Sequence, residues 1–372
     1  MYIACGSHPL LPLLITPHIP GKATSQTKVM GILSLPNELL FVVGEKLSIP
    51  DLLHLLPTCH RLLPVFTECL YNRFLQAEGE IALLQSAAKL NKTSLAEFAI
   101  SKGARVSWES EGPSESESNP APALHTAARY DSADVIRILF KRGAEIDALH
   151  DFETPLYVAV FWKSLKAIEV LLELGAKIQR EPTHPVGVEP PTHLAARRGD
   201  LDCMKVFLKN GFDFNIRCAS GKTVLHEATL AGEEMVEYLL QQEGGTKIIM
   251  AQDSNGSTPL HFVLRFQTER FEKWEGVLRL LLRYGANTEH LKIQDWRGNT
   301  PLHLAAVVRF GAEESVRILL RHGANTDLKN AWGNTPAEEA RWLGKGILYR
   351  IIMECGSKVS DQECVSVPHL AE

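Results

Sequence analysis

Histidines are the residues of this 372-residue chain that most invite a metal or acid–base interpretation. The chain has 14 of them, and five occupy the same place in similar short segments: His125, His193, His226, His261 and His303. Ligands of one zinc ion must all lie within about 2.3 Å of it, whereas neighbouring helices of a repeat pack about 10 Å apart. We therefore expect each histidine to form a buried hydrogen bond within its own copy and not to share a metal ion.

Other motifs that resemble catalytic or phosphate-binding signatures are incomplete. His226-Glu227 lacks the second histidine of a zinc protease, because position 230 is Leu. Gly221-Lys222-Thr223 is similar to the end of a phosphate-binding loop, but Ile216 stands where the first glycine belongs. No Gly-x-Ser-x-Gly segment occurs, and Cys59-His60 falls in a predicted helix that faces its own module. The sequence thus predicts no catalytic residue, no metal site and no cofactor.

Cysteine usage and charge restrict the compartment and the class of partner. The seven cysteines are an odd number, are scattered, and form no Cys-x-x-Cys pair. This pattern is typical of reduced thiols, so we expect the cytoplasm, the nucleus or both. The formal net charge of −5 does not favour a nucleic-acid or anionic-membrane partner, and no apolar run reaches the roughly 18 residues of a membrane helix.

The first residues, 1–31, are predicted to be a disordered leader. An apolar patch at residues 10–15 is interrupted or flanked by Pro9, Pro12 and Pro17, which would break a helix. A secretory signal, the alternative, needs a basic residue before its apolar helix, but here Lys22 is the first basic residue and follows the patch.

Residues 32–76 have the pattern of a small helical module. Ser34 and Pro36 are helix-start signals before an apolar segment, and Pro50-Asp51 precedes a second leucine-rich segment. A third segment has apolar residues every four positions, at Leu62, Phe66 and further on. About forty residues cannot bury enough apolar surface to be stable alone, so this module needs a partner surface. Gly44 is unexpected, since glycine inside a helix costs up to about 1 kcal/mol relative to alanine.

The module resembles the F-box. The resemblance rests on Leu-Pro-x-Glu-Leu-Leu at 35–40, on Leu47, on Asp51-Leu52-Leu53, and on Cys59-x-Arg61-Leu62. It implies docking onto the Skp-type adaptor of SCF ubiquitin ligases, through residues that would lie near that adaptor: Leu35, Pro36, Leu39, Leu40, Leu52, Leu53 and Leu55. The alternative is a helical cap on the domain that follows, which would need no such pattern.

An internal repeat decides the architecture of the rest of the chain. Segments similar to Thr-Pro-Leu-His-x-Ala-Ala recur, with their fourth positions at His125, Tyr157, His193, His226, His261 and His303. Thr before Pro is a helix start, and the paired alanines allow two helices to pack closely. Most copies continue into an amphipathic helix that ends in Gly-Ala, and glycine there can adopt the left-handed conformation that closes a helix.

This repeat resembles the ankyrin repeat. The resemblance implies an all-α fold, in which the three-helix F-box-like module precedes an α-solenoid with β-turn fingers. Six copies are clear, and degenerate copies at residues 82–88 and 335–340 bring the number to about eight, over residues 77–355. An F-box before ankyrin repeats is similar to the plan of many fungal proteins. Residues 107–120 are predicted to be an acidic, serine-rich loop, an insertion is expected around 267–274, and 356–372 form a tail.

A solenoid exposes a concave face built from turns and inner helices, and we expect a protein substrate to bind there. Arg, Trp and Tyr dominate binding hot spots, and several follow the alanine pair or lie in turns. The candidates are Arg129, Tyr130, Phe161, Trp162, Arg197, Arg198, Trp296, Arg297, Arg309, Phe310 and Trp332. Packing against the next repeat is the alternative role of these residues. Their arginine content favours an acidic or phosphorylated ligand.

The two resemblances together imply a non-catalytic substrate-recognition subunit of an SCF-type ubiquitin ligase. The resemblance to the F-box implies the Skp-type adaptor and the SCF core as partners, and the ankyrin face would hold a protein substrate whose identity the sequence does not give. No nucleic acid and no membrane is expected as a partner. The alternative is an ankyrin scaffold whose N-terminal helices serve only as a cap.

Overall fold

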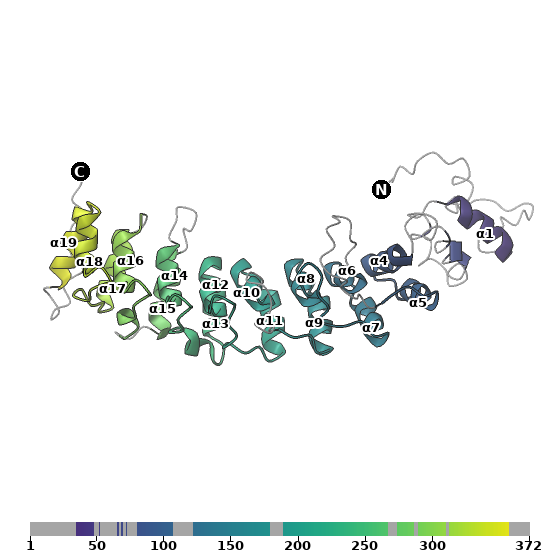
Figure 1. Cartoon of the computed structure of the whole chain (residues 1–372), viewed down its shortest axis with the longest axis horizontal. Coiled ribbons are helices and arrows are strands. Elements are labelled where there is room, and N and C mark those ends of the chain that lie inside the picture. Colours follow the sequence, from purple (N-terminus) through teal and green to yellow (C-terminus); the bar gives the residue numbers. More distant parts are fainter. Residues whose placement is uncertain are drawn as a thin grey trace, which may run out of the picture.

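The structure is a computed structural model, and it describes residues 35–47, 52, 65–66, 68–69, 72, 80–106, 122–178, 189–266, 274–285, 289–309 and 312–356. The described residues form an elongated, gently curved stack of helix pairs (Figure 1). Among them there is no β-strand, and the one isolated bridge joins His150 to Glu153. The predicted all-helical solenoid is confirmed.

Two rows of helices make up the stack, and each pair contributes one helix to each row (Figure 1). The inner helices lie on the concave side: α4 (Glu80–Leu90), α6 (Ala123–Arg129), α8 (Pro155–Phe161), α10 (Pro191–Arg198), α12 (Val224–Ala231), α14 (Pro259–Arg265), α16 (Pro301–Val307) and α18 (Pro336–Trp342). The outer helices are α5 (Thr93–Ser101), α7 (Ala133–Lys141), α9 (Leu165–Glu173), α11 (Leu201–Lys209), α13 (Glu233–Leu240), α15 (Trp274–Gly285), α17 (Ala312–Arg321) and α19 (Gly346–Gly356). Two short 3₁₀ turns, η3 (Gly245–Ile248) and η4 (His290–Lys292), follow α13 and α15.

Thr-Pro pairs start several of the inner helices, as predicted. The Thr154 hydroxyl accepts a hydrogen bond from the Tyr157 backbone N–H at 3.2 Å, and Pro155 takes the first helical position. The hydroxyl satisfies one of the free N–H groups of the first turn, and proline there lacks the N–H that would stay free. Thr258, Thr300 and Thr335 cap α14, α16 and α18 in the same way.

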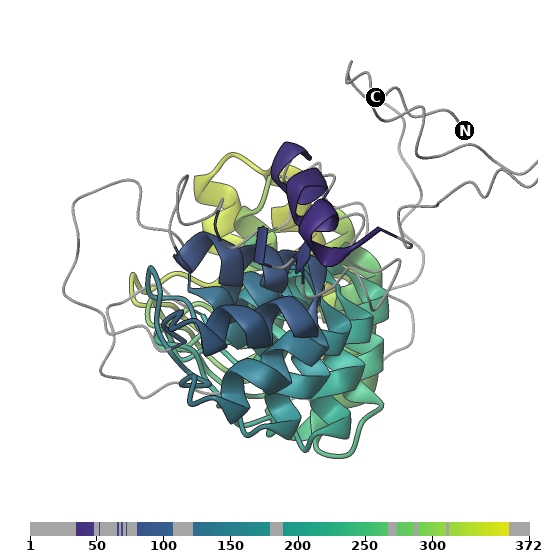
Figure 2. The same cartoon turned by 90° about the vertical axis from the view of Figure 1, so that its right-hand side faces the viewer.

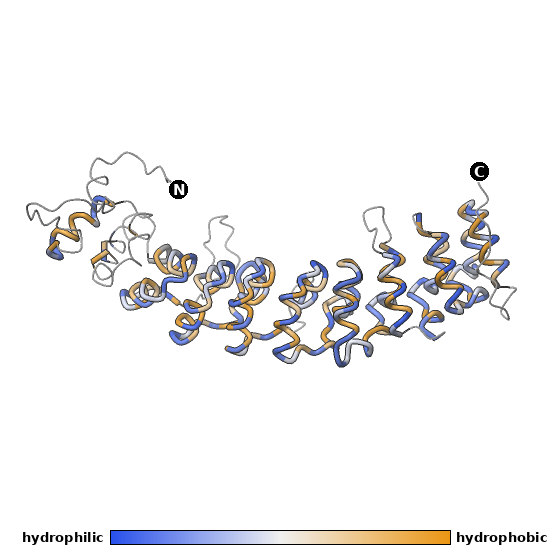
Figure 3. The backbone as a smooth tube through the Cα atoms, turned by 180° about the vertical axis from the view of Figure 1, so that it is seen from behind, coloured by the Kyte–Doolittle hydropathy of each residue, from blue (hydrophilic) through white to orange (hydrophobic). Residues whose placement is uncertain are grey.

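The core runs as a thin, continuous band between the two rows of helices. Ala127, Ala128, Ala195 and Ala196 are buried on the inner helices, where their small side chains let neighbouring pairs approach. Viewed along the stack, the helix pairs lie one behind another (Figure 2). Apolar stretches recur in both rows (Figure 3), so the apolar residues of each pair are covered mainly by its neighbours.

Turns that precede the inner helices form the fingers, which are bonded to one another. The Ser254 N–H donates to the Ser220 carbonyl at 2.9 Å, and the Ala331 N–H donates to the Arg297 carbonyl at 2.8 Å. Gly298 has a φ of +71°, and a Cβ there would lie 2.7 Å from the Ala331 nitrogen. Only glycine fits both this conformation and this close approach.

At the N-terminal end, α1 (Asn37–Lys46) packs through a buried face. Leu40, Leu52 and Phe66 are fully buried and belong to the same apolar core as Leu83 of α4. A Cβ on Gly44 would lie 2.7 Å from the Cys69 sulfur, so glycine allows the segment around Cys69 to approach α1 closely. This contact accounts for a glycine that helix propensity alone disfavours.

Helix α18 differs from the other inner helices in the residues it presents. Glu338 stands where other copies have histidine, and its carboxylate accepts hydrogen bonds from the Thr335 N–H at 2.7 Å and the Thr335 hydroxyl at 3.0 Å. Arg341 replaces the second alanine, is exposed, and lies over the Tyr349 ring at 5.6 Å. The last copy is therefore irregular at its own helix, as we expected.

Several predicted segments lie outside the described residues: the leader 1–31, most of the second segment of the N-terminal module, the acidic segment 107–120, residues 267–273 and most of the tail. The predicted insertion falls between Arg265, which ends α14, and Trp274, which begins α15. None of the helices in the described part is long and apolar enough to cross a membrane.

Candidate protein-binding surfaces

The repeated histidines link the five inner helices that carry them, α6, α10, α12, α14 and α16, to the finger that follows each helix. In His226, His261 and His303, Nδ1 accepts the backbone N–H of the capping threonine at 3.1, 3.2 and 3.2 Å. The proton must therefore be on Nε2, which donates to a carbonyl of the following finger. The acceptors are Ser257 at 3.0 Å, Asn299 at 3.1 Å and Asn334 at 3.0 Å. His125 and His193 make the same contact with Glu153 and Lys222.

These histidines are neutral structural groups. Burial lowers the pKa of His125, His226 and His261 to about 4, and it also lowers the pKa of His193 and His303. The predicted buried hydrogen bond in each copy is confirmed. In the part of the chain that the structure describes, no three His, Cys, Asp or Glu side chains form a possible metal site. Burial raises the pKa of the Cys203 thiol to about 11, which disfavours the nucleophilic thiolate.

Five of the predicted binding residues form one connected surface, which we call the loop-side rail: Arg129, Tyr130, Phe161, Trp162 and Arg198. They lie at or directly after the C-terminal ends of α6, α8 and α10. The Arg129 guanidinium stacks over the Trp162 ring at 4.1 Å, and the Phe161 and Trp162 rings are 5.6 Å apart. The Arg198 guanidinium lies 5.3 Å from the Phe161 ring. Contacts across three repeats therefore restrict the orientations of these side chains.

Hydrogen bonds between repeats fix the backbone under the rail. Arg198 donates to the Phe161 carbonyl at 2.6 Å, and the Ser164 hydroxyl donates to the Arg129 carbonyl at 3.0 Å. Each bond satisfies a carbonyl at the end of an inner helix from the following repeat. The buried Asp200 carboxylate pairs with Lys163 and lies 3.4 Å from the Arg198 Nε. Arg129, by contrast, forms no ion pair within the described residues.

Arg197 does not belong to the rail, although the sequence grouped it with Arg198. Its Nε lies 3.1 Å from Glu227, and it also pairs with Glu189. Glu227 is almost fully buried and is held on its other side by Lys222 at 3.0 Å. A buried carboxylate needs such partners, so Arg197 is used to stabilise the stack. The sequence analysis did not identify Glu227. An acidic residue at this place is unusual, because other copies have the apolar residues Val158, Leu194 or Phe262 there.

A second group lies on the fingers, which we call the fingertip cluster: Trp296, Arg297 and Trp332. The Arg297 guanidinium lies 4.6 Å from the Trp296 ring and 5.9 Å from the Trp332 ring. Both indoles are more than 60% exposed, at 63% and 61%. The fingers precede the inner helices and the rail follows them, so the two surfaces lie at opposite ends of the inner helices. They also belong to different repeats, since the rail lies on α6, α8 and α10 and the fingertip cluster lies before α16 and α18.

The remaining candidates of the concave face are not gathered into either group. Arg309 is exposed beyond the end of α16, and Phe310 lies outside the described residues. The carbonyl of Val307 at the end of α16 accepts a hydrogen bond from the Lys345 ammonium at 2.8 Å. The structure thus divides the predicted single face into two aromatic surfaces, a structural arginine, Arg197, and an exposed arginine outside both surfaces, Arg309.

The residues predicted to lie near an adaptor differ in how far their side chains are exposed. Pro36 is exposed, Leu39 is 51% exposed, and Leu35 is half-buried. Leu40 and Leu52 are fully buried and belong to the apolar core, so their side chains are not exposed, and their predicted place near an adaptor stays a prediction. Val42, which sequence reasoning did not include, is 51% exposed on α1. Leu53 and Leu55 lie outside the described residues.

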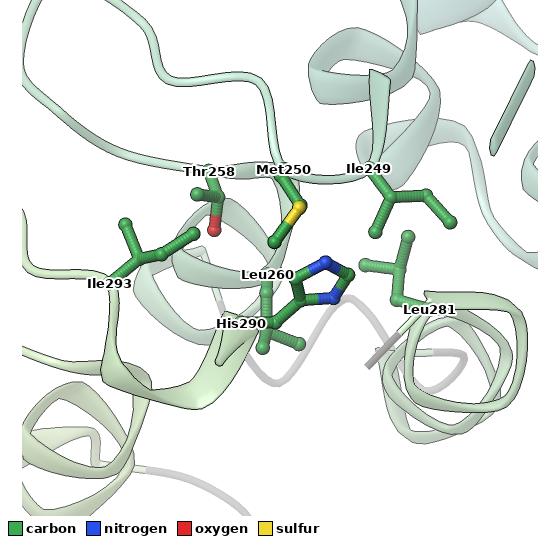
Figure 4. A pocket seen from close by; sticks show the side chains of 7 residues that line it. All are labelled: Ile249, Met250, Thr258, Leu260, Leu281, His290 and Ile293. Carbon is green, nitrogen blue, oxygen red and sulfur yellow. The ribbon is translucent and has the colours of Figure 1, made fainter. Parts of the chain in front are cut away.

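The described residues also enclose a small cavity and, beside the rail, an open hollow. A cavity of about 10 Å³ lies between His290, Thr258 and the apolar side chains shown in Figure 4. That volume holds about one water molecule, so this cavity is not a ligand site. An open hollow of about 370 Å³ lies next to the rail, and its lining residues are Arg198, Gly199, Ala231, Glu233, Glu234 and Met235.

Comparison with known families identifies the repeats. A family model described as ankyrin repeats (3 copies) matches residues 83–181, 192–274 and 246–330. The matches cover more than half of the chain and begin after the F-box-like module, whose assignment therefore stays a prediction.

Curated relatives match over part of their length. The E3 ubiquitin-protein ligase KEG of Arabidopsis thaliana is 28% identical over 158 residues, which is 41% of this chain and 10% of that protein. Ankyrin repeat and SOCS box protein 11 of Homo sapiens is 32% identical over 126 residues, which is 33% of this chain and 37% of that protein. The ankyrin repeat domain-containing protein SAT10 of Stachybotrys chartarum is 32% identical over 172 residues, covering 45% and 8%. This chain thus spans well under half the length of these relatives.

A solved structure agrees with the fold. The ankyrin repeat domain of Bcl-3 matches with a TM-score of 0.50 and 26% identity, over 63% of this chain and all of that domain. The stack of helix pairs is thus shared with a known architecture, one that typically serves as a non-catalytic scaffold for protein interactions. The chain belongs to the ankyrin-repeat family.

Proposed function

We propose that this chain is a substrate-binding subunit of an SCF-type ubiquitin ligase. In this proposal the N-terminal helical segment docks onto a Skp-type adaptor, and the ankyrin stack holds a protein for ubiquitin transfer by other subunits. The chain itself performs no chemistry. Docking at one end raises the effective concentration of the bound substrate near the conjugating enzyme.

The exposed apolar face of α1 is the observation that carries the proposal. Leu39 and Val42 are three positions apart, so they share one face of the helix, and each is 51% exposed. Leu40 and Gly44 face the core on the other side. Large apolar side chains beside each other on a short terminal helix favour a protein partner. Leu39 also belongs to the F-box-like Leu-Pro-x-Glu-Leu-Leu pattern.

The curated relatives give independent support. One is named as an E3 ubiquitin-protein ligase and another carries a SOCS box in its name, so ankyrin repeats similar to these occur in proteins of ligase pathways. Their matches cover part of this chain only, so the ligase role of this chain rests mainly on α1.

Co-purification with a Skp-type adaptor tests the docking. We expect the full chain to retain the adaptor, and Leu39→Asp with Val42→Asp to abolish retention without changing the melting temperature. The matched control is Ile347→Asp with Met353→Asp, because these residues are 61% and 52% exposed at the other end of the stack. If the α1 variant binds the adaptor as the unchanged chain does, or if no adaptor binds the unchanged chain, the docking assignment is wrong.

A second function, a protein-binding scaffold with an N-terminal cap, is favoured by the shared core. Leu40, Leu52 and Phe66 are buried and belong to the same apolar core as Leu83 of α4, which supports a role for the N-terminal segment as a cap on the first repeat. Deletion of residues 1–76 should then lower the melting temperature and expose Leu83. The point variants on α1 separate the two functions, because the cap function predicts no adaptor binding by any form of the chain.

A further inference from the structure

The loop-side rail is a preorganised apolar surface. Tyr130, Phe161 and Trp162 are each nearly half exposed, at 46%, 46% and 49%. Exposed aromatic side chains in contact across repeats are unusual on a surface that nothing covers. The stacked guanidinium groups and the backbone hydrogen bonds beneath them restrict these side chains before any partner arrives. A partner would therefore lose little further side-chain freedom at this surface.

Charge differs between the two ends of the rail. At the α6 end, the Arg129 guanidinium stacks on Trp162 and has no carboxylate partner among the described residues. At the other end, the hollow beside Arg198 contains Glu233 and Glu234 at the start of α13. The Glu233 carboxyl group lies against Gly276 of α15, whereas Glu234 is exposed and makes no ion pair within the described part of the chain.

The distance between the two ends determines the size of a complementary ligand. Arg129 and Glu234 belong to helix pairs three steps apart, and each step is about 10 Å. The two charges are therefore separated by about 30 Å, which an extended peptide spans with about nine residues at about 3.3 Å each. The aromatic side chains of the rail lie between these two charges, where they can contact the middle of such a peptide.

From this arrangement we infer that the loop-side rail binds an extended segment of a protein partner that carries an acidic and a basic residue about nine positions apart. The acidic side chain pairs with Arg129, where a planar guanidinium can hold a carboxylate in two hydrogen bonds. Apolar side chains between the two charges pack on Trp162 and Phe161. The basic side chain enters the hollow and pairs with Glu234.

A single free guanidinium at the α6 end favours a carboxylate over a phosphate. Phosphate groups are usually bound by clusters of arginines, whereas Arg198 is engaged with the Phe161 carbonyl and lies beside Asp200. This inference deepens the proposed role of the repeats as the substrate-binding part of the chain, and it does not depend on adaptor docking.

Fluorescent peptides of about twelve residues test the inference on the full chain. All the peptides share one apolar spacer. Their ends carry an acid and a base in either order, two acids, two bases, or a phosphoserine and a base. We expect one or both of the mixed-charge peptides to bind at least about tenfold more tightly than the uniform ones, a difference measured by fluorescence anisotropy.

Charge reversal makes the test specific. Arg129→Glu should shift the preference to the peptide with two bases, and Glu234→Arg should shift it to the peptide with two acids. Trp162→Ala should weaken every peptide. The matched controls are Arg142→Glu and Glu243→Arg, two exposed residues near the opposite ends of α7 and α13, and these should change nothing.

Three results would overturn the inference: equal binding of all peptides, best binding of a uniform or phosphorylated peptide to the unchanged chain, or no binding at about 1 mM peptide. An unchanged preference in both charge-reversal variants would also overturn it. Adaptor co-purification fails or succeeds independently of these measurements, so the two proposals can be rejected separately.

Discussion

The interior repeats and the last described repeat solve the same local problem with different residues. In α14, His261 accepts the N–H of Thr258 through Nδ1 and donates to the Asn299 carbonyl of the next finger through Nε2. In α18, Glu338 accepts the N–H and the hydroxyl of Thr335, and its carboxylate has no proton with which to reach a following finger. Histidine thus serves two repeats at once, whereas glutamate serves only its own helix.

This difference shows how a single side chain can couple two neighbouring repeats. Imidazole has an acceptor and a donor on opposite sides of one ring, so the bond that caps a helix also orients the bond to the next finger. A carboxylate has only acceptors. The residue at this place therefore determines whether a helix is tied to its successor.

The largest loss of stability is expected when a histidine that joins an interior helix to the next finger is removed. His261→Ala should lower the free energy of unfolding by about 3 kcal/mol, because two buried groups, the Thr258 N–H and the Asn299 carbonyl, lose their partners. Glu338→Ala should cause a much smaller loss, since only an exposed helix start is affected. Urea unfolding followed by circular dichroism measures both. Equal losses in the two variants would contradict the two-repeat role of histidine.

The finger glycines offer the same comparison without a change of charge. Gly298 and Gly333 both have a positive φ, at +71° and +81°, but a Cβ meets the next finger only at Gly298. Gly298→Ala should cost about 2 kcal/mol, from backbone strain plus a steric clash, and Gly333→Ala about 1 kcal/mol, from strain alone. Thermal unfolding of both variants provides the measurement. A greater loss at Gly333 would show that contact between fingers contributes little.

The stability that the buried histidines of the interior helices contribute should depend on pH. Burial lowers the pKa of His226 and His261 from 6.5 to about 4, so the unfolded chain binds more protons in this range. Stability is therefore complete above pH 6.5 and is lost as the pH falls towards 4, with a slope of about 1.4 kcal/mol per pH unit for each such histidine. Urea midpoints between pH 4.5 and 7 should show this, and His261→Gln should reduce the slope. A flat profile would contradict neutral buried histidines.

The smallest effect is expected when the last helix receives the interior residue. In Glu338→His, Nδ1 can replace the carboxylate at Thr335, so the cap is kept. The structure shows no finger of the described residues beyond α18 for Nε2 to reach. The urea midpoint should therefore change very little at pH 7. A clear gain in stability would show that this ring finds a second partner.

The repeats were predictable from the sequence because each depends on contacts within a few residues. Thr-Pro at a helix start acts over three positions, and the paired alanines mark a close helix contact wherever they occur. The role of the repeated histidines was predicted for the same reason. Their acceptors were not, since Asn299 lies 38 residues after His261 and only the stacking of fingers brings the two together.

The candidate surfaces were predicted less well, since residue type does not reveal what a side chain already contacts. Arg197 and Arg198 are neighbours in sequence, but the first is used by the buried Glu227 and the second joins the rail. Leu39 and Leu40 likewise match one motif, but Leu39 is exposed and Leu40 is buried, because neighbouring residues of a helix lie on different faces. Which member of each pair is free depends on partners in other repeats.

Arg341 has a consequence for the behaviour of the chain in concentrated solution. Interior helices carry buried, uncharged residues such as Ala196 and Ala306 at this place, and those surfaces accept another repeat. The Arg341 guanidinium would have to be desolvated before helices of a second molecule could stack on this surface of α18. Arg341 therefore opposes self-association of the chain through this surface.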